Sequence, residues 1–162
     1  MMFILFRALI YATAFIGILL VGVPARLLVW TGQAIPQSAG VPQAIGIGVT
    51  AVGALLVAWC IGMFVFVGRG TQAPFDPPRR LVIGGPYAIV RNPMYVGAVF
   101  AMSGAALYYG SWPLFTYAAV VLIVTHVFVV AYEEPTLRHT FGDEYSKYCQ
   151  HVARWAPHVR SS

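Results

Sequence analysis

The sequence NPMYVGAVFAMSGAALYYGSWPLFTYAAVVLIVTHVFVVAY (residues 92–132) decides the fold, because it contains no aspartate, glutamate, lysine or arginine. A membrane-spanning helix needs about 20 predominantly apolar residues, so this stretch is long enough for two. The segment YGSWP (residues 109–113) predicts a tight turn between them. We therefore expect spans over about 93–109 and 113–132, and the shorter of the two must tilt or thin the bilayer locally.

Two further spans are predicted nearer the N-terminus. Residues 27–68 also lack charged side chains, and the proline- and glycine-containing segment 31–43 reads as a loop within them. The spans are therefore placed at about 3–23 and 45–67. The first is expected to be retained and not cleaved as a signal peptide, because Pro24-Ala25-Arg26 is a poor cleavage site.

Composition agrees with this assignment. The chain is 59% hydrophobic and only 9% charged, whereas soluble domains carry about 25% charged residues. A soluble fold of this size has too little interior to bury so much apolar surface. The predicted fold class is all-α, an integral-membrane helical bundle of about four transmembrane helices with a C-terminal amphipathic cytoplasmic helix. It forms one domain over residues 1–162.

Charge asymmetry predicts the orientation. With four spans, both termini, the loop 69–92 and the tail 133–162 share one side. That side holds nearly all of the basic residues, namely Arg7, Arg69, Arg79, Arg80, Arg91, Arg138, Lys147, Arg154 and Arg160, and the other side holds Arg26. By the positive-inside rule the loop and the tail are cytoplasmic, and a bacterial inner membrane is the expected location. The net charge of +5 then needs no nucleic-acid partner.

Histidine and cysteine spacing predicts neither a metal site nor a disulfide. Cys60 lies within a predicted span and Cys149 in the tail, so they cannot pair. The four histidines lack ligand spacing. His126, inside the last span, is expected to make a helix-to-helix hydrogen bond in preference to acting as a base.

Small residues in the second predicted span indicate close helix packing. Gly46, Gly48 and Gly53 loosely resemble a nucleotide-binding loop, but no strand precedes them and they lie inside an apolar helix. Glycines in such a position allow neighbouring helices to approach closely. We therefore expect a packing role for them.

Polar chemistry gathers at both ends of the 92–132 stretch. Pro93 suits the first turn of a helix, and a helix N-terminus beside Arg91 is a ready site for a carboxylate or phosphate. Glu133 and Glu134 lie at the C-terminal end of a helix, where their charge opposes the helix dipole. They therefore require a cation, which can be Arg91 or a ligand. A non-functional interpretation is also open, with an ion pair between this acidic pair and Arg138.

The tail is predicted to form the amphipathic helix. Pro135 is expected to end or kink the last span. Residues 136–152 carry apolar side chains at steps of three and four, namely Leu137, Phe141, Tyr145, Tyr148 and Val152. Gly142 weakens this helix, and Trp155 suits an interfacial anchor. Such a helix can close a cavity above the ends of the spans.

Four segments together resemble a known superfamily. They are Gly85-Pro86-Tyr87, residues 91–97 (RNPMYVG), Glu133-Glu134 and residues 141–148 (FGDEYSKY). In this order they resemble the isoprenylcysteine carboxyl methyltransferase and phospholipid methyltransferase superfamily over residues 76–157. The resemblance implies a small membrane enzyme that uses S-adenosylmethionine, with a lipidic acceptor entering from the bilayer.

The resemblance also implies a set of site residues. Arg91 and Glu134 are the expected catalytic residues, and the expected cofactor-binding residues are Gly85, Pro86, Tyr87, Arg91, Asn92, Pro93, Tyr95, Gly97, Glu133 and Glu134. Arg91 and the helix N-terminus suit the cofactor carboxylate. Either glutamate suits its ammonium or ribose hydroxyls, and Tyr87 or Tyr95 suits its adenine or methyl group.

Asn92 departs from the superfamily pattern, since many relatives have histidine there. Asparagine can donate hydrogen bonds but cannot act as a base. If the acceptor must be deprotonated, Glu134, a tyrosine or the substrate itself has to serve. A carboxylate acceptor needs no base, whereas an amine or a thiol does. The sequence predicts neither the acceptor nor the oligomeric state.

Two alternatives come from other functional classes. One is a nicotinamide-dependent membrane reductase resembling the sterol reductases, whose C-terminal region is distantly similar to this superfamily. The other is a non-catalytic membrane adaptor whose tail binds a partner. A cofactor-binding comparison separates the first from a methyltransferase, and the second predicts no small-molecule binding.

Overall fold

The computed structural model describes residues 6, 10, 13–14, 16–38, 40–68 and 79–157. Parts of the predicted span 3–23, loop 69–92 and tail 133–162 lie outside these residues. The described part contains helices and no named strands, which agrees with the predicted all-α fold class. Its α-helices and π-helical segments are, in chain order, η1 (Ile16–Gly22), α2 (Val23–Trp30), α3 (Val41–Met63), η2 (Phe64–Gly68), α4 (Pro93–Tyr109), α5 (Trp112–Phe128), η4 (Val129–Glu133) and α6 (Glu134–His151).

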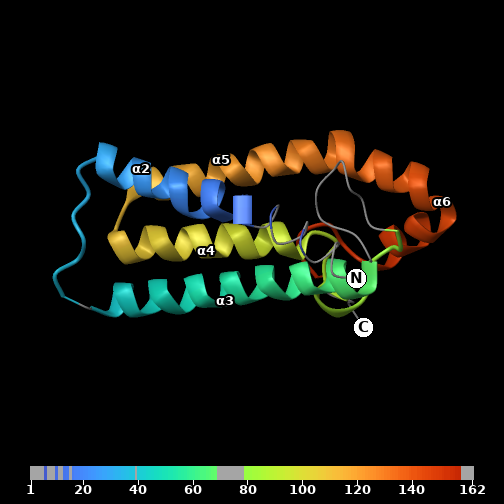
Figure 1. Ribbon diagram of the computed structural model, residues 1–162, viewed down its shortest axis with the longest axis horizontal. Coiled ribbons are helices and arrows are strands. Elements are labelled where there is room, and N and C mark those ends of the chain that lie inside the picture. The colour runs from blue at the N-terminus through green and yellow to red at the C-terminus, as the bar shows by residue number, and fades with distance from the viewer. Residues whose placement is uncertain are drawn as a thin grey trace.

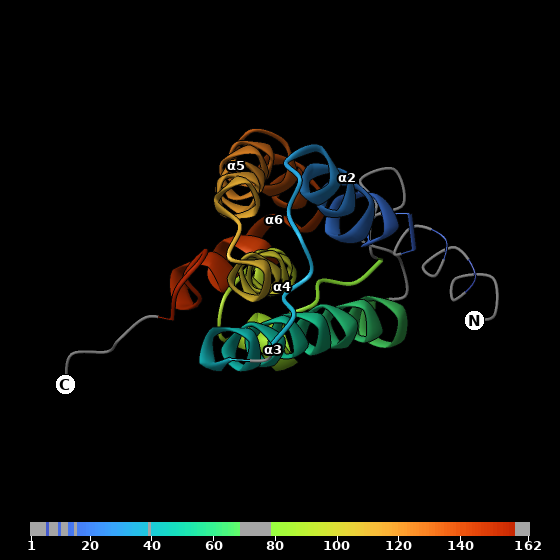
Figure 2. The same ribbon diagram turned by 90° about the vertical axis from the view of Figure 1, so that its left-hand side faces the viewer.

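The helices run side by side along the long axis of the molecule (Figure 1). Viewed end-on, α4 lies in the middle, with α3 on one side and α2 and α5 on the other (Figure 2). A buried cluster of Val57, Ala98, Met102 and Ala118 joins α3, α4 and α5. The core of the bundle therefore follows α4, and the residues just before α4 sit at one end of this core.

The observed helix bounds agree closely with the predicted bounds at α4 and less well elsewhere. α4 covers Pro93–Tyr109, as predicted, and Gly110 follows it with a φ of 61° as the start of the turn. α3 begins at Val41, earlier than the predicted residue 45, because Pro42 occupies its first turn. Proline is tolerated there since its missing N–H would have no helical partner. The loop before α3 is correspondingly shorter than predicted.

The last span does not end at Pro135. The chain passes from α5 through the π-helical segment η4 directly into α6, so of the two expectations for Pro135, an end or a kink of the helix, the end was wrong. Two helices in the described part are long and apolar enough to cross a membrane, 41–68 and 112–151. The second bends at Gly142, and its part before the bend, residues 112–141, is about 45 Å long, which exceeds the roughly 30 Å hydrocarbon thickness of a bilayer. Its charges begin at Glu133, so we take Tyr132 as the end of its apolar part.

α3 and α4 approach each other backbone to backbone. A methyl group added at Gly46 would lie 2.7 Å from the Gly104 carbonyl oxygen, and one at Gly53 would lie 2.5 Å from the Gly97 carbonyl oxygen. The predicted packing role is therefore confirmed for Gly46 and Gly53. It is wrong for Gly48, whose added methyl group would meet nothing within 4 Å.

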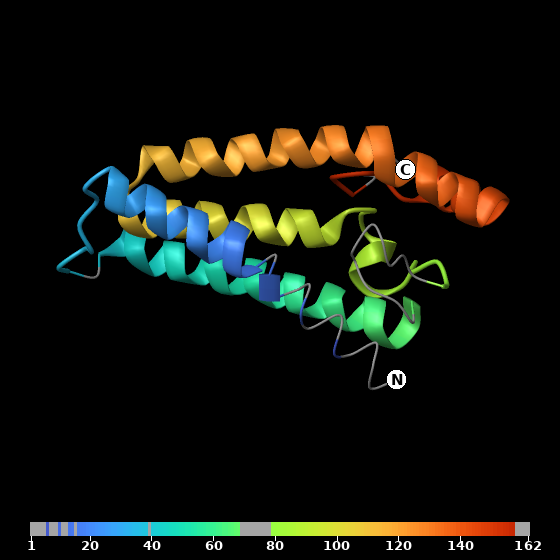
Figure 3. The same ribbon diagram turned by 45° about the horizontal axis from the view of Figure 1, so that its top comes forward.

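The tail reverses direction at Gly142. This residue has a φ of 51° and a ψ of −122° inside α6, so the predicted helix 136–152 is two pieces. Beyond the bend the chain returns toward the start of α4 (Figure 3), where Val90 and Ala153 form an isolated parallel β-bridge. Tyr145 and Val152 of the predicted apolar face are buried.

Replacing Gly53 by alanine should destabilise the protein by about 1–3 kcal/mol, because the new methyl group meets backbone atoms of α4 at 2.5 Å. The matched control is Gly48→Ala on the same helix, which should stay within about 0.5 kcal/mol of wild type. Thermal unfolding in mild detergent measures both. Equal unfolding midpoints for the two variants would contradict the assigned helix contact.

Candidate functional site

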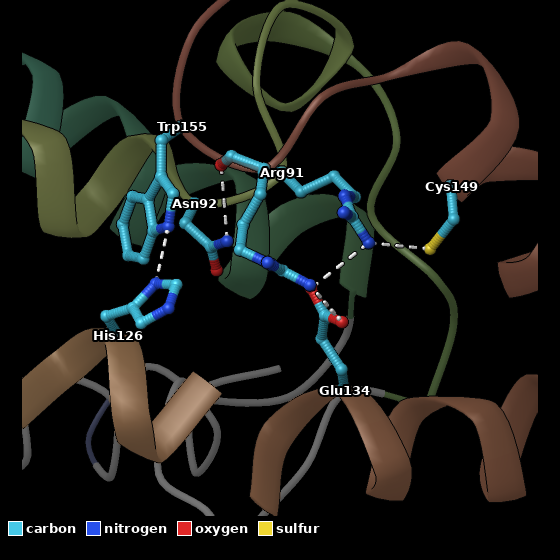
Figure 4. A network of polar contacts seen from close by, with 7 residues as sticks. Arg91, Asn92, His126, Glu134, Cys149 and Trp155 are labelled. Atoms are coloured by element: carbon cyan, nitrogen blue, oxygen red, sulfur yellow. Dashed lines mark hydrogen bonds and ion pairs between the residues drawn. The ribbon is translucent and has the colours of Figure 1, made fainter. Parts of the chain in front are cut away.

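Three charged side chains from distant segments meet at one end of the bundle (Figure 4). Arg91 precedes α4, Glu134 begins α6, and Arg154 follows α6. The Arg91 Nη1 lies 3.1 Å from the Glu134 Oε1. The Arg154 Nε donates to the Glu134 Oε1 at 2.7 Å, and its Nη2 donates to Oε2 at 3.0 Å. Both oxygens of the Glu134 carboxylate are thus engaged by guanidinium groups.

Burial makes this cluster electrostatically significant. The Glu134 and Arg91 side chains are only 8% and 12% exposed, while the Arg154 side chain is 31% exposed. Burial alone would raise the pKa of Glu134, but the hydrogen bonds from Arg154 and the charge of Arg91 outweigh it, so the pKa is lowered. Glu134 is therefore ionised at neutral pH and is a poor general base. The three groups together carry one net positive charge.

Arg91 has further contacts that hold it in place. Its backbone N–H donates to the Ala153 carbonyl at 2.9 Å, and its Nη1 donates to the Cys149 sulfur at 2.8 Å. Its Nε is buried and has no hydrogen-bond partner among the described residues. A buried donor without a partner costs free energy. Arg91 therefore retains capacity for an anionic ligand.

Asn92 contacts the returning tail. It is buried, and its Nδ2 donates to the Arg154 carbonyl at 3.3 Å. Pro93 lies next to it as the first residue of α4 and is fully buried. Asn92 therefore holds the chain that carries Arg154, with one of its two amide N–H donors.

Glu133 occupies a different environment from its neighbour. It is half-buried, and the Tyr95 hydroxyl donates to its Oε2 at 3.0 Å. Burial raises the pKa of Glu133, the Tyr95 bond lowers it, and the nearby charge of Glu134 raises it again, with a net increase. The two adjacent carboxylates therefore have pKa values shifted in opposite directions.

The segment before Arg91 packs against α3 and the tail. Gly85–Ala88 forms the short 3-10 helix η3, in which Pro86 and Tyr87 are buried. The Tyr87 ring packs edge-on against the Phe64 ring, with 5.5 Å between the ring centroids. The backbone carbonyl of Tyr87 accepts a hydrogen bond from the Tyr148 hydroxyl at 2.6 Å. Burial raises the pKa of Tyr87 well above its usual value, so its phenol stays protonated.

Two of the predicted cofactor-binding glycines have packing environments that need no ligand. Gly97 lies against α3, where an added methyl group would be 2.9 Å from the Gly53 carbonyl oxygen. Gly85 has a φ of 59° and lies beside Met63, so its turn favours glycine. The structure thus brings Arg91, Asn92 and Glu134 together and leaves Gly97 between helices.

His126 bonds to the tail and not to another helix, so the expected helix-to-helix bond was wrong. The Trp155 indole Nε1 donates to the His126 Nδ1 at 3.0 Å (Figure 4). The same indole lies 6.5 Å, centroid to centroid, from the Tyr95 ring. Trp155 therefore connects α5 to the residues around Glu133.

Residue patterns do not predict Arg154 and Cys149 as parts of this site. The sequence places Arg154 among the basic residues of the tail and offers Arg138 as a partner of the acidic pair. A buried carboxylate needs more than one cation or donor, and this need is the only indication in the sequence that a second arginine joins Arg91 at Glu134. Its position depends on the reversal at Gly142, which residue spacing does not specify.

Comparison with known proteins identifies the family. A family model described as phospholipid methyltransferase matches residues 41–144, nearly two thirds of the chain. No curated protein and no solved structure matches the chain. The matched region contains Arg91, Glu133 and Glu134 and ends before Arg154. Together with the two long apolar helices, the match indicates a membrane protein.

Replacing Glu134 by glutamine should destabilise the protein by about 1–3 kcal/mol at pH 7, because two partly buried guanidinium groups then face each other without a countercharge. The matched control is Glu144→Gln, an exposed carboxylate on the same helix, which should unfold close to wild type. Thermal unfolding in detergent measures both. A Glu134 variant as stable as the control would show that the cluster contributes nothing.

The same variant should reveal a pH dependence. Because the pKa of Glu134 is lowered in the folded state, its contribution is fully present above the ordinary glutamate value of about 4.3. It is lost as the pH falls through the lower folded-state value. The stability difference between wild type and Glu134→Gln should therefore be constant from about pH 5.5 to 8 and shrink below about pH 4. A difference that instead grows on acidification would contradict this assignment.

Proposed function

The chain belongs to the phospholipid methyltransferase family, and we propose that it transfers a methyl group from S-adenosylmethionine to a lipidic or membrane-embedded acceptor. The observation that carries this proposal is the meeting of Arg91 and Glu134 at one end of the bundle. These residues are far apart in sequence. The resemblance assigns Arg91 to the cofactor carboxylate and either Glu133 or Glu134 to its ammonium or ribose hydroxyls. Their convergence supports a single site for a zwitterion.

The residues present fit the charged groups of this cofactor. Arg91, at the N-terminus of α4 and with its buried Nε unpaired, is suited to the carboxylate. Glu134 is ionised and is suited to the ammonium. When bound, S-adenosylmethionine supplies a methyl group on an already activated sulfonium. The chain then has to orient donor and acceptor and to exclude water.

Proton removal separates the possible acceptors. An amine or thiol acceptor must lose a proton during transfer, whereas a carboxylate acceptor need not. We assign this role to Glu133 in preference to Glu134, because the pKa of Glu133 is raised and its carboxylate is not bound by Arg154. The Tyr95 hydroxyl, which donates to Glu133, would hold this carboxylate in position.

A cavity of about 540 Å³ near the tail supports an amphiphilic acceptor. It lies between the end of η2, the segment 79–81 and α6. Its lining combines apolar and charged side chains, namely Phe66, Val67, Arg79, Arg80, Leu81, Phe141 and Glu144. Such a lining suits a lipid whose polar headgroup stays at the membrane surface.

The full topology is also part of the proposal. We place four spans in a bacterial inner membrane, with loop 69–92, the tail and the methyl-transfer site on the cytoplasmic side. The support is the distribution of arginine between the two ends of the bundle and the cytoplasmic supply that a soluble cofactor requires. α4 is shorter than a usual span, at about 25 Å, and lies between α3 on one side and α2 and α5 on the other (Figure 2).

Purified protein should bind S-adenosylhomocysteine in a calorimetric titration and should not bind a nicotinamide dinucleotide. Arg91→Ala should weaken binding of S-adenosylhomocysteine by about 1–3 kcal/mol, since it removes the proposed carboxylate partner. The control is Arg26→Ala, on α2 outside the cluster, which should bind like wild type. Wild-type protein that fails to bind S-adenosylhomocysteine at millimolar concentration would overturn the proposal. Binding of the nicotinamide dinucleotide alone would favour the reductase alternative.

Incubation with cofactor carrying an isotope-labelled methyl group should transfer the label to a component of a lipid extract, which mass spectrometry identifies. Transfer to an amine or thiol should be strongly reduced in Glu133→Gln, because the proton acceptor is lost. Transfer to a carboxylate should survive in this variant. A Glu133 variant that methylates an amine at the wild-type rate would refute the role of Glu133.

A further inference from the structure

The chain after α6 is held across the start of α4 by a small number of contacts. We call residues 152–157 the tail strap. The Ala153 carbonyl accepts from the Arg91 backbone N–H at 2.9 Å, and the Arg154 carbonyl accepts from the Asn92 amide at 3.3 Å. The indole of Trp155 donates to His126. A segment that is held by so few bonds can detach without unfolding the bundle.

Arg154 is the outermost member of the charged cluster. Its side chain is 31% exposed, compared with 8% for Glu134 and 12% for Arg91. It comes from the tail strap, whereas its two partners are anchored at the ends of long helices. Of the two guanidinium groups on Glu134, that of Arg154 is therefore the one that can leave at the lower cost.

The Arg154 guanidinium presents to Glu134 the same chemistry as an ammonium ligand. It carries one positive charge and places two N–H donors on the carboxylate at 2.7 and 3.0 Å. A ligand ammonium would need the same oxygens and would offer the same charge and donors. The two cannot occupy this carboxylate fully at the same time.

We propose that Arg154 is an internal occupant of the ammonium subsite of this protein, and that the ammonium of the bound cofactor displaces it from Glu134. This inference rests on the proposed function and adds a regulatory step at the same site. Without ligand, Arg154 keeps Glu134 ionised and in position. With ligand, Glu134 binds the ammonium, and the released Arg154 frees the tail strap.

Displacement has two consequences for the reaction cycle. The apparent affinity for the cofactor is reduced by the fraction of molecules in which Arg154 holds Glu134. The demethylated product keeps the same ammonium, so Arg154 competes with it as well and favours its release. Because Trp155 lies beside the Tyr95 ring, movement of the tail strap also uncovers the tyrosine that contacts Glu133.

Calorimetry on the full chain in detergent tests the competition. Arg154→Gln should bind S-adenosylhomocysteine about 3- to 30-fold more tightly than wild type, because the internal competitor is gone. The same variant should bind 5′-methylthioadenosine, which lacks the amino-acid end, with unchanged affinity. Lys147→Gln, at an exposed position on α6, controls for the loss of one positive charge and should resemble wild type with both ligands.

Hydrogen exchange on the wild-type protein gives an independent readout that needs no variant. The backbone amide of Arg91, which donates to the Ala153 carbonyl of the tail strap, should exchange faster when S-adenosylhomocysteine saturates the site. A tail strap that closes over the ligand would slow this exchange. If Arg154→Gln does not fold, this measurement alone decides, with Arg154→Lys as a milder variant that should show a smaller gain in affinity.

The outcomes separate this inference from the proposed function. Wild-type protein that does not bind S-adenosylhomocysteine overturns both. Wild-type binding combined with equal or weaker binding by Arg154→Gln, or with slower exchange of the Arg91 amide, overturns the displacement and leaves the methyltransferase proposal standing. If Arg154→Gln gained as much affinity for 5′-methylthioadenosine as for S-adenosylhomocysteine, the variant would have loosened the whole site. This result would also overturn the displacement.

Discussion

The ionised carboxylate of Glu134 holds together the end of the bundle at which the charged cluster lies. A buried carboxylate is stable only when cations and hydrogen-bond donors surround it, and here one comes from before α4 and one from after α6. The single charge therefore ties together three segments that are distant in sequence. When Arg154 leaves, Arg91 still compensates the carboxylate, so the position of the tail is coupled to the charged cluster without being required for it.

The helix bundle supplies the rigidity that this charged cluster needs. α3 and α4 meet through glycines at Gly46, Gly53, Gly97 and Gly104, which bring backbone against backbone. Such packing leaves little freedom for α4 to slide or rotate. Arg91 lies immediately before α4, so its position is fixed by the packing of α4 on α3. The tail, in contrast, is held by far fewer contacts. The rigid and the movable halves of the site thus have different structural origins.

Much of this arrangement could be predicted from the sequence, and the remainder has a physical reason. α4 and its turn at Gly110 follow from a charge-free run broken by glycine and proline. The proximity of Arg91 and Glu134 follows from their placement at the ends of neighbouring helices. Arg154 could not be predicted, because its approach depends on a positive-φ turn at Gly142. The direction that the chain takes after such a turn is set by packing against distant residues, and the periodicity of apolar residues does not predict it. Asn92 and Gly97 are explained in the structure by contacts with the tail and with α3, so their assignment to cofactor binding still awaits a test.

The π-helical segment Val129–Glu133 determines which way the acidic pair faces. Its hydrogen bonds close over one residue more than those of an α-helix, so everything beyond it is turned relative to a continuation of α5. If the same residues were wound as a regular α-helix, α6 would be turned by about 100°, which would carry the carboxylates to another side of the bundle. The one extra residue in this segment therefore sets the direction of the acidic pair and leaves the winding of α5 unaltered.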